Sequence, residues 1–330
     1  MRLLGWHTVF GRASGDTAIG KGDANVTGTA ARKATKSEFD KMAPQIADLK
    51  AATWITRGGN FAVVVSRVEP GAVLQRASDP EEHMVIVPPD GPTLSISAGG
   101  KTIEAKADSL TIVPPGASTI TATSTGLFAQ IYSKASTDIM ALASNAATYA
   151  DGAPELAPPD LWPAPRDGYK LRYYPLAQYA KADGDRIQPR VFRSTNMLVN
   201  LFVPFKTRRE TVGLSPHWHD DFEQASLTLR GRWVHHLRYN WGPDLATWIA
   251  DDHGEMTTPS VIIIPATAVH TSRDVGEGVS SLYDIFCPPR LDFARKKGFV
   301  INEDEYPLPD LPSDDTVKTG GSLLAWQKPG

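Results

Sequence analysis

The chain has 330 residues, of which 41% are hydrophobic and 22% charged, and its formal net charge is −3. This length supports about two domains with ordinary cores, the apolar fraction excludes a disordered chain, and the near-neutral charge argues against nucleic-acid binding. The single cysteine, Cys287, excludes an internal disulfide framework and any multi-cysteine metal site within one chain.

No segment is suited to crossing a membrane. No apolar run approaches the roughly 18 to 20 residues that a spanning helix needs. The apolar stretch in residues 1–7 is too short for a signal peptide. We therefore expect a cytoplasmic protein without a membrane partner. Residues 1–35 are rich in glycine, alanine and threonine, which indicates an arm or an extra pair of strands.

The predicted elements are mostly short strands separated by turns. Glycine and proline residues, 27 and 26 in number, fall between β-rich runs. Many short strands separated by turn residues are typical of a β-sandwich or barrel, so we predict an all-β fold. The clearest runs are residues 61–65, 84–87, 94–96, 110–113 and 261–264.

Helical signals are sparse. Ser37 can cap a short helix that runs through Met42, and Ser136 or Thr137 can begin another. A third short helix is predicted within residues 292–297.

A proline-rich segment, residues 151–168, has the composition of a linker. It separates an N-terminal part, residues 1–150, from a C-terminal part of similar length, residues 169–330. Two comparable domains are therefore predicted, the second ending in a C-terminal tail.

One segment of the second part carries residue types that bind metals. His217 and His219 are two apart in a strand-like run, so both side chains lie on the same face. Glu223 follows a probable bend at residues 220–221, and His270 follows a buried run and a turn. Three imidazoles and one carboxylate suit iron, manganese, nickel, zinc or copper and leave open positions on an octahedral ion. We predict one divalent transition metal held by these four side chains.

The same segment resembles the two signature motifs of the cupin superfamily. The first motif is a glycine, His-x-His, a glutamate after three or four residues, and a closing glycine about seven residues later; the second is Pro-x-Gly-x-x-His. The matching positions are Gly213, His217, His219, Glu223 and Gly231, and then Pro265 and His270. The gap after Gly213 is two residues shorter than the family pattern, and the gap from Glu223 to Gly231 is one residue longer. Thr267 stands where the family usually has glycine.

The first part resembles a degenerate second copy of this pattern. When its glycine and proline are aligned with those of the second part, His83 falls at the position of Glu223 and Thr119 at that of His270. One imidazole does not make a metal site, so we expect the first copy to stabilise the protein or to mediate dimerisation. The resemblance thus implies two tandem cupin barrels, of the jelly-roll or double-stranded β-helix type, with a metal only in the second.

Other residues near the motifs are weaker candidates. Residues 240–253 form an insertion rich in tryptophan and acidic residues, which either shapes the pocket mouth or forms a dimer contact. Only one histidine of the pair 235–236 can face the barrel interior, because successive strand residues alternate. Tyr283 or Asp284 lines the pocket in this interpretation. The charged run 206–210 is expected to be a solvated turn.

The cupin resemblance implies a metal-dependent reaction on a small organic molecule. The leading hypothesis is a mononuclear non-haem iron dioxygenase, with Fe(II) as the favoured ion. One alternative is an O₂-independent lyase, isomerase or decarboxylase, in which manganese, zinc or nickel acts as a Lewis acid. Another is a non-enzymatic cupin that binds a small ligand. We expect a homodimer, and the catalytic residues beyond the metal ligands stay unassigned.

Overall fold

A computed structural model of the chain describes residues 32–180, 187–310 and 320–322. Most of the predicted N-terminal arm lies outside these residues. Antiparallel strands dominate the described part, and the two α-helices in it are short, α1 (Thr137–Leu142) and α2 (Leu291–Ala294). In the same described residues, no helix is long and apolar enough to cross a membrane.

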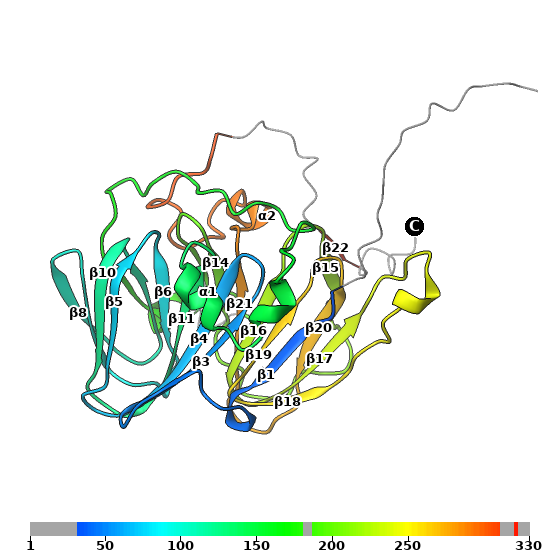
Figure 1. Ribbon diagram of the computed structural model, residues 1–330, viewed down its shortest axis with the longest axis horizontal. Helices are drawn as coiled ribbons and strands as arrows, with labels where there is room; N and C mark the ends of the chain where they lie inside the picture. The colour runs from blue at the N-terminus through cyan, green and yellow to red at the C-terminus, as the bar shows by residue number, and fades with distance from the viewer. Residues whose placement is uncertain (1–31, 181–186, 311–319, 323–330) are drawn as a thin grey trace, which may run out of the picture. The chain divides into compact units, whose positions relative to one another are not determined.

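The first barrel consists of two antiparallel sheets whose facing sides enclose an apolar core (Figure 1). The larger sheet has the strand order β12-β9-β6-β11-β4-β3-β2, and the smaller has the order β5-β10-β7-β8. The strands are β2 (Ile46–Ala47), β3 (Ala51–Arg57), β4 (Phe61–Val68), β5 (Val73–Asp79), β6 (His83–Val87), β7 (Leu94–Ala98), β8 (Lys101–Ala105), β9 (Ser109–Val113), β10 (Gly116–Ala122), β11 (Gly126–Ser133) and β12 (Arg172–Pro175).

The second barrel is also built from two antiparallel sheets. Their orders are β1-β19-β16-β21-β14-β13 and β18-β17-β20-β15-β22. The strands are β1 (Thr35–Glu38), β13 (Val191–Arg193), β14 (Leu198–Leu201), β15 (His217–His219), β16 (Gln224–Arg230), β17 (Arg232–Arg238), β18 (Glu255–Thr257), β19 (Ser260–Ile264), β20 (Val269–Asp274), β21 (Ser281–Phe286) and β22 (Gly320–Ser322). The predicted all-β, two-barrel jelly-roll fold is confirmed.

The strand predictions hold better than the helix predictions. All five predicted runs lie within strands, namely β4, β6, β7, β9 and β19. The helix predicted after Ser37 is wrong: Thr35–Glu38 is strand β1, and only a single 3₁₀ turn, η1 (Phe39–Lys41), follows it. Pairing of β1 with the edge of β19 overrides the local helix signal. The helix predicted to begin at Ser136 or Thr137 exists as α1, and the one predicted within residues 292–297 exists as α2, which begins one residue earlier and ends at Ala294.

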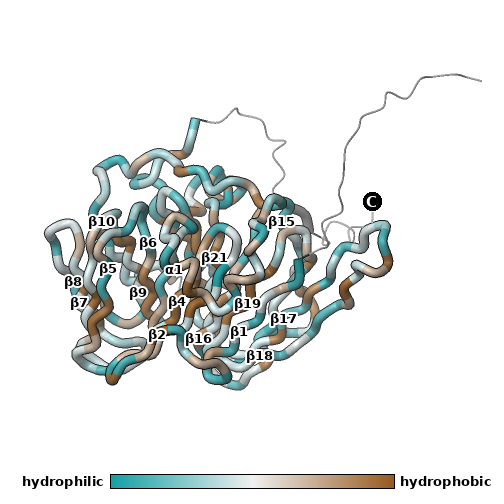
Figure 2. Tube along the Cα trace, in the orientation of Figure 1, coloured by the Kyte–Doolittle hydropathy of each residue, from teal (hydrophilic) through white to brown (hydrophobic). Residues whose placement is uncertain are grey.

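The largest hydrophobic core lies between the two barrels. Strand β4 is buried along almost its whole length, and Val63 and Val65 point from it into this core. Leu227 of β16 and Ile263 of β19 approach from the second barrel. The hydrophobic colour is concentrated around β4 near the centre of Figure 2. Each large sheet therefore buries both faces, which explains why these strands read as continuous apolar runs instead of alternating ones.

The two barrels exchange one strand each, so the sheets do not follow the boundaries predicted from the linker. Strand β1, drawn in blue in Figure 1, pairs with β19 of the second barrel, with Thr35 opposite Ile263. Strand β12 pairs with β9 of the first barrel, with Arg172 opposite Ile112. Residues 151–168 contain no strand or helix, in keeping with their linker composition.

A single glycine makes the tight turn between β16 and β17. Gly231 has a φ of +103°, and a Cβ at this position would come within 2.4 Å of the Cβ of Ser280. Both facts exclude a larger residue. This turn carries the chain from the sheet that contains β16 to the sheet that contains β17.

Candidate metal centre

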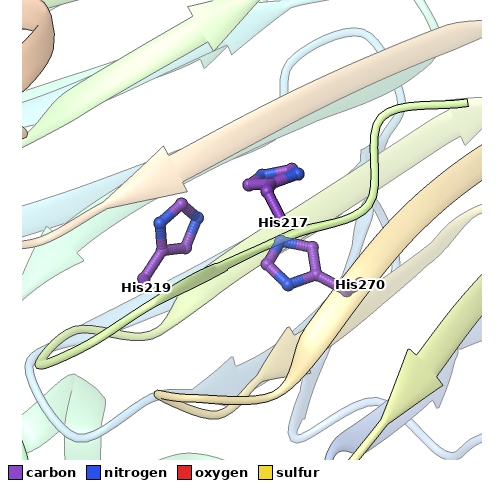
Figure 3. Close-up of side chains that lie close together, drawn as sticks. All are labelled: His217, His219 and His270. Carbon is purple, nitrogen blue, oxygen red and sulfur yellow. The ribbon is translucent and has the colours of Figure 1, made fainter. Parts of the chain in front are cut away.

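Three of the four predicted ligands come together inside the second barrel. His217 and His219 lie on β15, and His270 lies directly opposite His217 on the neighbouring strand β20. The three side chains each offer a ring nitrogen, and these nitrogens all lie within 4.8 Å of one another. Figure 3 shows the imidazoles converging from the two strands. Residues two apart on one strand and a cross-strand partner share one face, so the pleat itself creates this cluster.

Gln224, not Glu223, completes the cluster. Gln224 is the first residue of β16, and its Oε1 lies 3.0 Å from Nε2 of His219 and 3.2 Å from Nε2 of His270. The amide oxygen therefore occupies the place that the sequence analysis gave to the carboxylate of Glu223.

The carboxylate of Glu223 points away from the imidazoles. Its Oε1 accepts a hydrogen bond of 2.8 Å from the hydroxyl of Tyr149, and its Oε2 accepts one of 2.6 Å from the N–H of Gly59. A side chain at the neighbouring Gly58 would place its Cβ only 2.7 Å from Oε2, so the absence of one permits this approach. Glu223 thus connects the first half of the chain to the start of β16.

The sequence contained a signal for this correction. The gap between Glu223 and Gly231 is one residue longer than in the cupin pattern. With Gln224 as the ligand, four residues separate it from His219 and Gly231 follows seven residues later, as the pattern requires. Because adjacent strand residues face opposite sides, a shift of one residue exchanges the inward and outward side chains.

A buried carboxylate fixes the orientation of the Gln224 amide. The Nε2 group of Gln224 donates to Oδ1 of Asp284 at 3.0 Å and to Oγ of Ser226 at 2.9 Å. The hydroxyl of Ser226 in turn donates to the same Oδ1 at 2.7 Å. Burial raises the pKa of Asp284 to about 6. With its NH₂ group held by these partners, Gln224 presents its oxygen to the imidazoles.

The donor set fits a divalent metal ion. Nδ1 of His270 donates to the carbonyl oxygen of Ala268 at 2.9 Å, and burial lowers the pKa of this ring to about 3, so Nε2 carries a lone pair. This lone pair faces the oxygen of Gln224. Two acceptors that face each other repel, and a cation bound between them removes the repulsion. Nδ1 of His217 likewise donates to the carbonyl of Ser215, leaving its Nε2 for a metal.

A cavity of about 190 Å³ opens beside these residues. His217, Gln224, His270 and Asp284 form its inner end. Its walls are mainly apolar, and the other lining residues are Ile187, Phe202, Phe205, Arg209, Ser215, Trp233, Thr271, Ser272, Asp274 and Leu282. The arrangement places a small molecule next to the predicted metal position.

Arg209 is a site residue that the sequence analysis missed. It lies in the run expected to be a solvated turn, yet it lines the cavity. Its guanidinium donates to the carbonyl of Ser272 at 2.7 Å and to the hydroxyl of Ser215 at 3.2 Å. No local pattern identifies this residue, because it lies in a loop without a strand or helix and its contact with Ser272 depends on the fold.

The structure distinguishes the weaker candidates that line the cavity from those that do not. Asp284 lines the cavity, whereas the neighbouring Tyr283 packs into the core between the barrels. His235 is buried and its neighbour His236 is more exposed, as the strand alternation predicts. None of the residues 240–253, all of which the structure describes, lines the cavity; Trp241 and Trp248 stack on each other at 4.2 Å.

No protein-family model and no curated sequence matches the chain. Among solved structures, a variant of oxalate decarboxylase from Bacillus subtilis matches with a TM-score of 0.51 and 15% identity, over 76% of each chain. Another oxalate decarboxylase structure matches with a TM-score of 0.52 and 15% identity, over 78% of each chain. A cupin 2 conserved barrel domain protein from Leptotrichia buccalis matches with a TM-score of 0.46 and 7% identity, over 77% of this chain and 96% of that chain. Together with the two jelly-roll barrels and the histidine triad, the oxalate decarboxylase matches show that this chain has the bicupin fold.

Proposed function

We propose that the protein is a metal-dependent enzyme that acts on a small organic molecule bound in the cavity of the second barrel. One observation carries this proposal: three imidazole nitrogens and one amide oxygen converge at the inner end of a cavity. His217, His219, Gln224 and His270 would hold the ion. A bound divalent ion supplies Lewis acidity there, and Fe(II) adds redox chemistry with O₂.

The charge of the donor set favours a substrate that binds through an anionic oxygen. Three neutral imidazoles and a neutral amide compensate none of the charge of a divalent cation, whereas a glutamate ligand would. Arg209 adds a guanidinium to the wall of the same cavity. A carboxylate, enolate or phenolate oxygen therefore suits this site better than a neutral group.

The walls favour a substrate with an apolar body. Phe202, Phe205 and Trp233 pack edge to face or tilted against one another, and Leu282 lies beside them. These side chains form an apolar side of the cavity, apart from its polar lining residues, against which a hydrocarbon or aromatic group can pack. We infer a small molecule with one acidic oxygen and a hydrocarbon or aromatic remainder.

For the reaction itself we propose O₂-dependent oxidation with Fe(II). This choice rests on the histidine-rich ligand set and on the aromatic side chains in the cavity wall. O₂-independent decarboxylation is the second candidate. The likeness in fold to oxalate decarboxylase favours it, as an analogy between folds.

The test uses the full chain, purified without chelator and without a metal-affinity step. Its metal content is measured, and the protein is then loaded with Fe(II), Mn(II) or Zn(II). Each form is incubated with small phenols, 1,3-diketones, aryl carboxylates and oxalate, in air and without oxygen. The matched control is the variant His217→Ala/His219→Ala under the same conditions.

Oxygen uptake that requires Fe(II) and is absent from the control supports the dioxygenase. Anaerobic release of CO₂, again absent from the control, supports the decarboxylase in its place. A parent protein that retains no metal after loading overturns the proposal and leaves a cupin barrel that only binds a ligand.

A further inference from the structure

The first barrel contains a cavity of its own, about 320 Å³ in volume. It lies between the two sheets of this barrel, since residues of β3, β4 and β11 line it from one side and residues of β5 and β10 from the other. Helix α1 closes part of it with Ile139 and Leu142. The volume falls within the range of small-molecule sites, at its lower end.

The walls of this cavity are largely aliphatic. Ile55, Val64, Leu74, Ile120 and Ile139 line it. At its mouth three more apolar side chains stay about half exposed to solvent, with exposed fractions of 49% for Ile46, 50% for Val73 and 46% for Leu142. Exposed apolar side chains gathered around an opening are typical of a site that takes up an apolar molecule.

Two buried polar side chains face the cavity, and each has a hydrogen-bonding group that is not used within the described part of the protein. Gln130 and Tyr132 are two apart on β11, so they lie on the same face, and they are 4% and 2% exposed. The Nε2 group of Gln130 donates to the hydroxyl oxygen of Tyr132 at 2.6 Å. Within the described residues, this leaves the amide oxygen of Gln130 and the hydroxyl proton of Tyr132 without a partner. A buried acceptor and donor side by side match one hydroxyl group of a ligand.

The strand register relates the interior of the first barrel to the metal site of the second. His83 begins β6 and lies opposite Val113, just before Pro114, as Gln224 begins β16 and lies opposite Ile264, just before Pro265. His83 is thus the counterpart of Gln224 and not of Glu223, which corrects the alignment made from sequence.

The same register extends to the neighbouring strand. Gln130 of β11 lies opposite Val85, as Asp284 of β21 lies opposite Ser226, so Gln130 is the counterpart of Asp284. The first barrel therefore places His83 and Gln130 where the second places Gln224 and the carboxylate of Asp284.

Charge at the first cavity disfavours an anionic ligand. Arg76 is the cationic residue in the lining, and it is already paired with two carboxylates, at 2.8 Å from Oδ1 of Asp79 and 2.9 Å from Oδ1 of Asp138. A carboxylate ligand would therefore lie near two carboxylates and only one guanidinium group, so the net charge of this cluster would repel it. Asp48, the other carboxylate of the lining, is exposed and accepts hydrogen bonds from the backbone N–H groups of Lys50 and Ala51. An ammonium ligand inside the cavity would therefore lose its hydration without a buried, unpaired carboxylate in return.

We propose that the first barrel binds a small neutral molecule with a hydrocarbon body and one hydroxyl group, which Gln130 and Tyr132 recognise. This site is separate from the metal centre and does not depend on a metal. It gives the first barrel a binding role in addition to the structural one that its strands already have.

The test is an NMR titration of the full chain with hexan-1-ol as the probe, alongside hexanoate and hexylamine, which carry the same hydrocarbon. We expect hexan-1-ol to saturate one site with a Kd on the order of 1 mM, given the burial of about six methylene groups. Hexanoate and hexylamine should bind at least tenfold more weakly. Equal or tighter binding of either charged probe overturns the proposed ligand class, and absence of saturable binding of all three overturns the site.

Variants locate the site. Leu142→Trp fills the mouth from a half-exposed position and should abolish binding, whereas Leu161→Trp, at another exposed position, should leave it unchanged. Tyr132→Phe removes the hydroxyl that donates to the ligand and that accepts from Gln130. It should weaken the binding of hexan-1-ol about fivefold, the effect of one hydrogen bond. The variant His217→Ala/His219→Ala should bind like the parent. Binding that survives Leu142→Trp, or that disappears with the two histidines, contradicts the proposal.

Discussion

The two barrels share a scaffold and differ in the side chains that it presents at equivalent positions. In the second barrel, Gln224 and Asp284 stand at the inner end of a cavity with three histidines. In the first, His83 and Gln130 occupy the corresponding register positions. His83 stacks on Tyr132 at 4.7 Å, and burial lowers its pKa to about 4. The second barrel thus gathers three imidazoles that could hold a metal, whereas the first offers one imidazole at the position of Gln224.

The comparison teaches that the fold supplies positions and not chemistry. Both barrels place residues two apart on one strand, and a partner on the next, toward a common interior. Whether these positions hold a metal depends on having several imidazoles at once. Within the described residues, His217, His219 and His270 form the group that meets this condition. Substitutions that change one barrel and leave the other intact test the contrast.

The largest expected effect is the loss of metal on removal of two imidazoles. The variant His217→Ala/His219→Ala should fall from about one equivalent of metal to below about 0.1, because two of four ligands are missing. His83→Ala, in the first barrel, should keep the metal content of the parent. Elemental analysis of the three proteins decides the matter. A metal-free His83→Ala protein would mean that the ion binds elsewhere than in the second barrel.

A second contrast lies within the second barrel, between adjacent residues. Gln224→Ala should weaken metal binding roughly 10- to 100-fold, since it removes a ligand oxygen. Glu223→Gln should change the affinity by less than about threefold, because this carboxylate contacts Tyr149 and Gly59 and not the imidazoles. Competition with a chromophoric chelator measures both constants. The reverse order of effects would restore Glu223 as the ligand.

Tight turns in the two barrels should differ in their tolerance of a side chain. Gly231→Ala should lower the free energy of unfolding by about 2 to 4 kcal/mol, because a Cβ there collides with Ser280 at a φ of +103°. Gly100→Ala, in the β7–β8 turn, should cost only about 1 kcal/mol, since its φ is +73° but no heavy atom lies within 4 Å of the added Cβ. Urea denaturation measures both. Equal losses would show that backbone conformation alone sets the cost.

The smallest expected effect is a pH dependence in the first barrel. The hydrogen bond from Arg76 lowers the pKa of Asp138 below its usual 3.8, so the charged carboxylate stabilises the fold above that value. As the pH falls through the lowered pKa, this contribution disappears. Asp138→Asn should therefore be less stable than the parent by about 0.5 kcal/mol at pH 7, because half-exposed pairs contribute little, and equally stable near pH 2. Thermal unfolding at the two pH values checks this. A difference that persists unchanged at low pH would contradict it.

Much of this protein follows from its sequence because short-range patterns decide it. Alternating and continuous apolar runs indicated the strands β4, β6, β7, β9 and β19. The His-x-His spacing placed two imidazoles on one face, and the structure brings them together with His270. Each of these features depends on residues close in sequence, or on motifs that keep a constant spacing.

The features that only the tertiary structure determines depend on strand register and on the packing of loops and strands. The choice between Glu223 and Gln224 follows from where β16 begins, and pairing with β19 and β21 sets that point. Arg209 reaches the cavity on a loop. Strand β1 forms on the edge of the other barrel in place of a helix. At β1 a long-range pairing outweighs a local helix preference of about 1 kcal/mol. The gap to Gly231 pointed to Gln224, but the pairing of β16 decides which side chain faces the imidazoles, and the packing of the loop places Arg209.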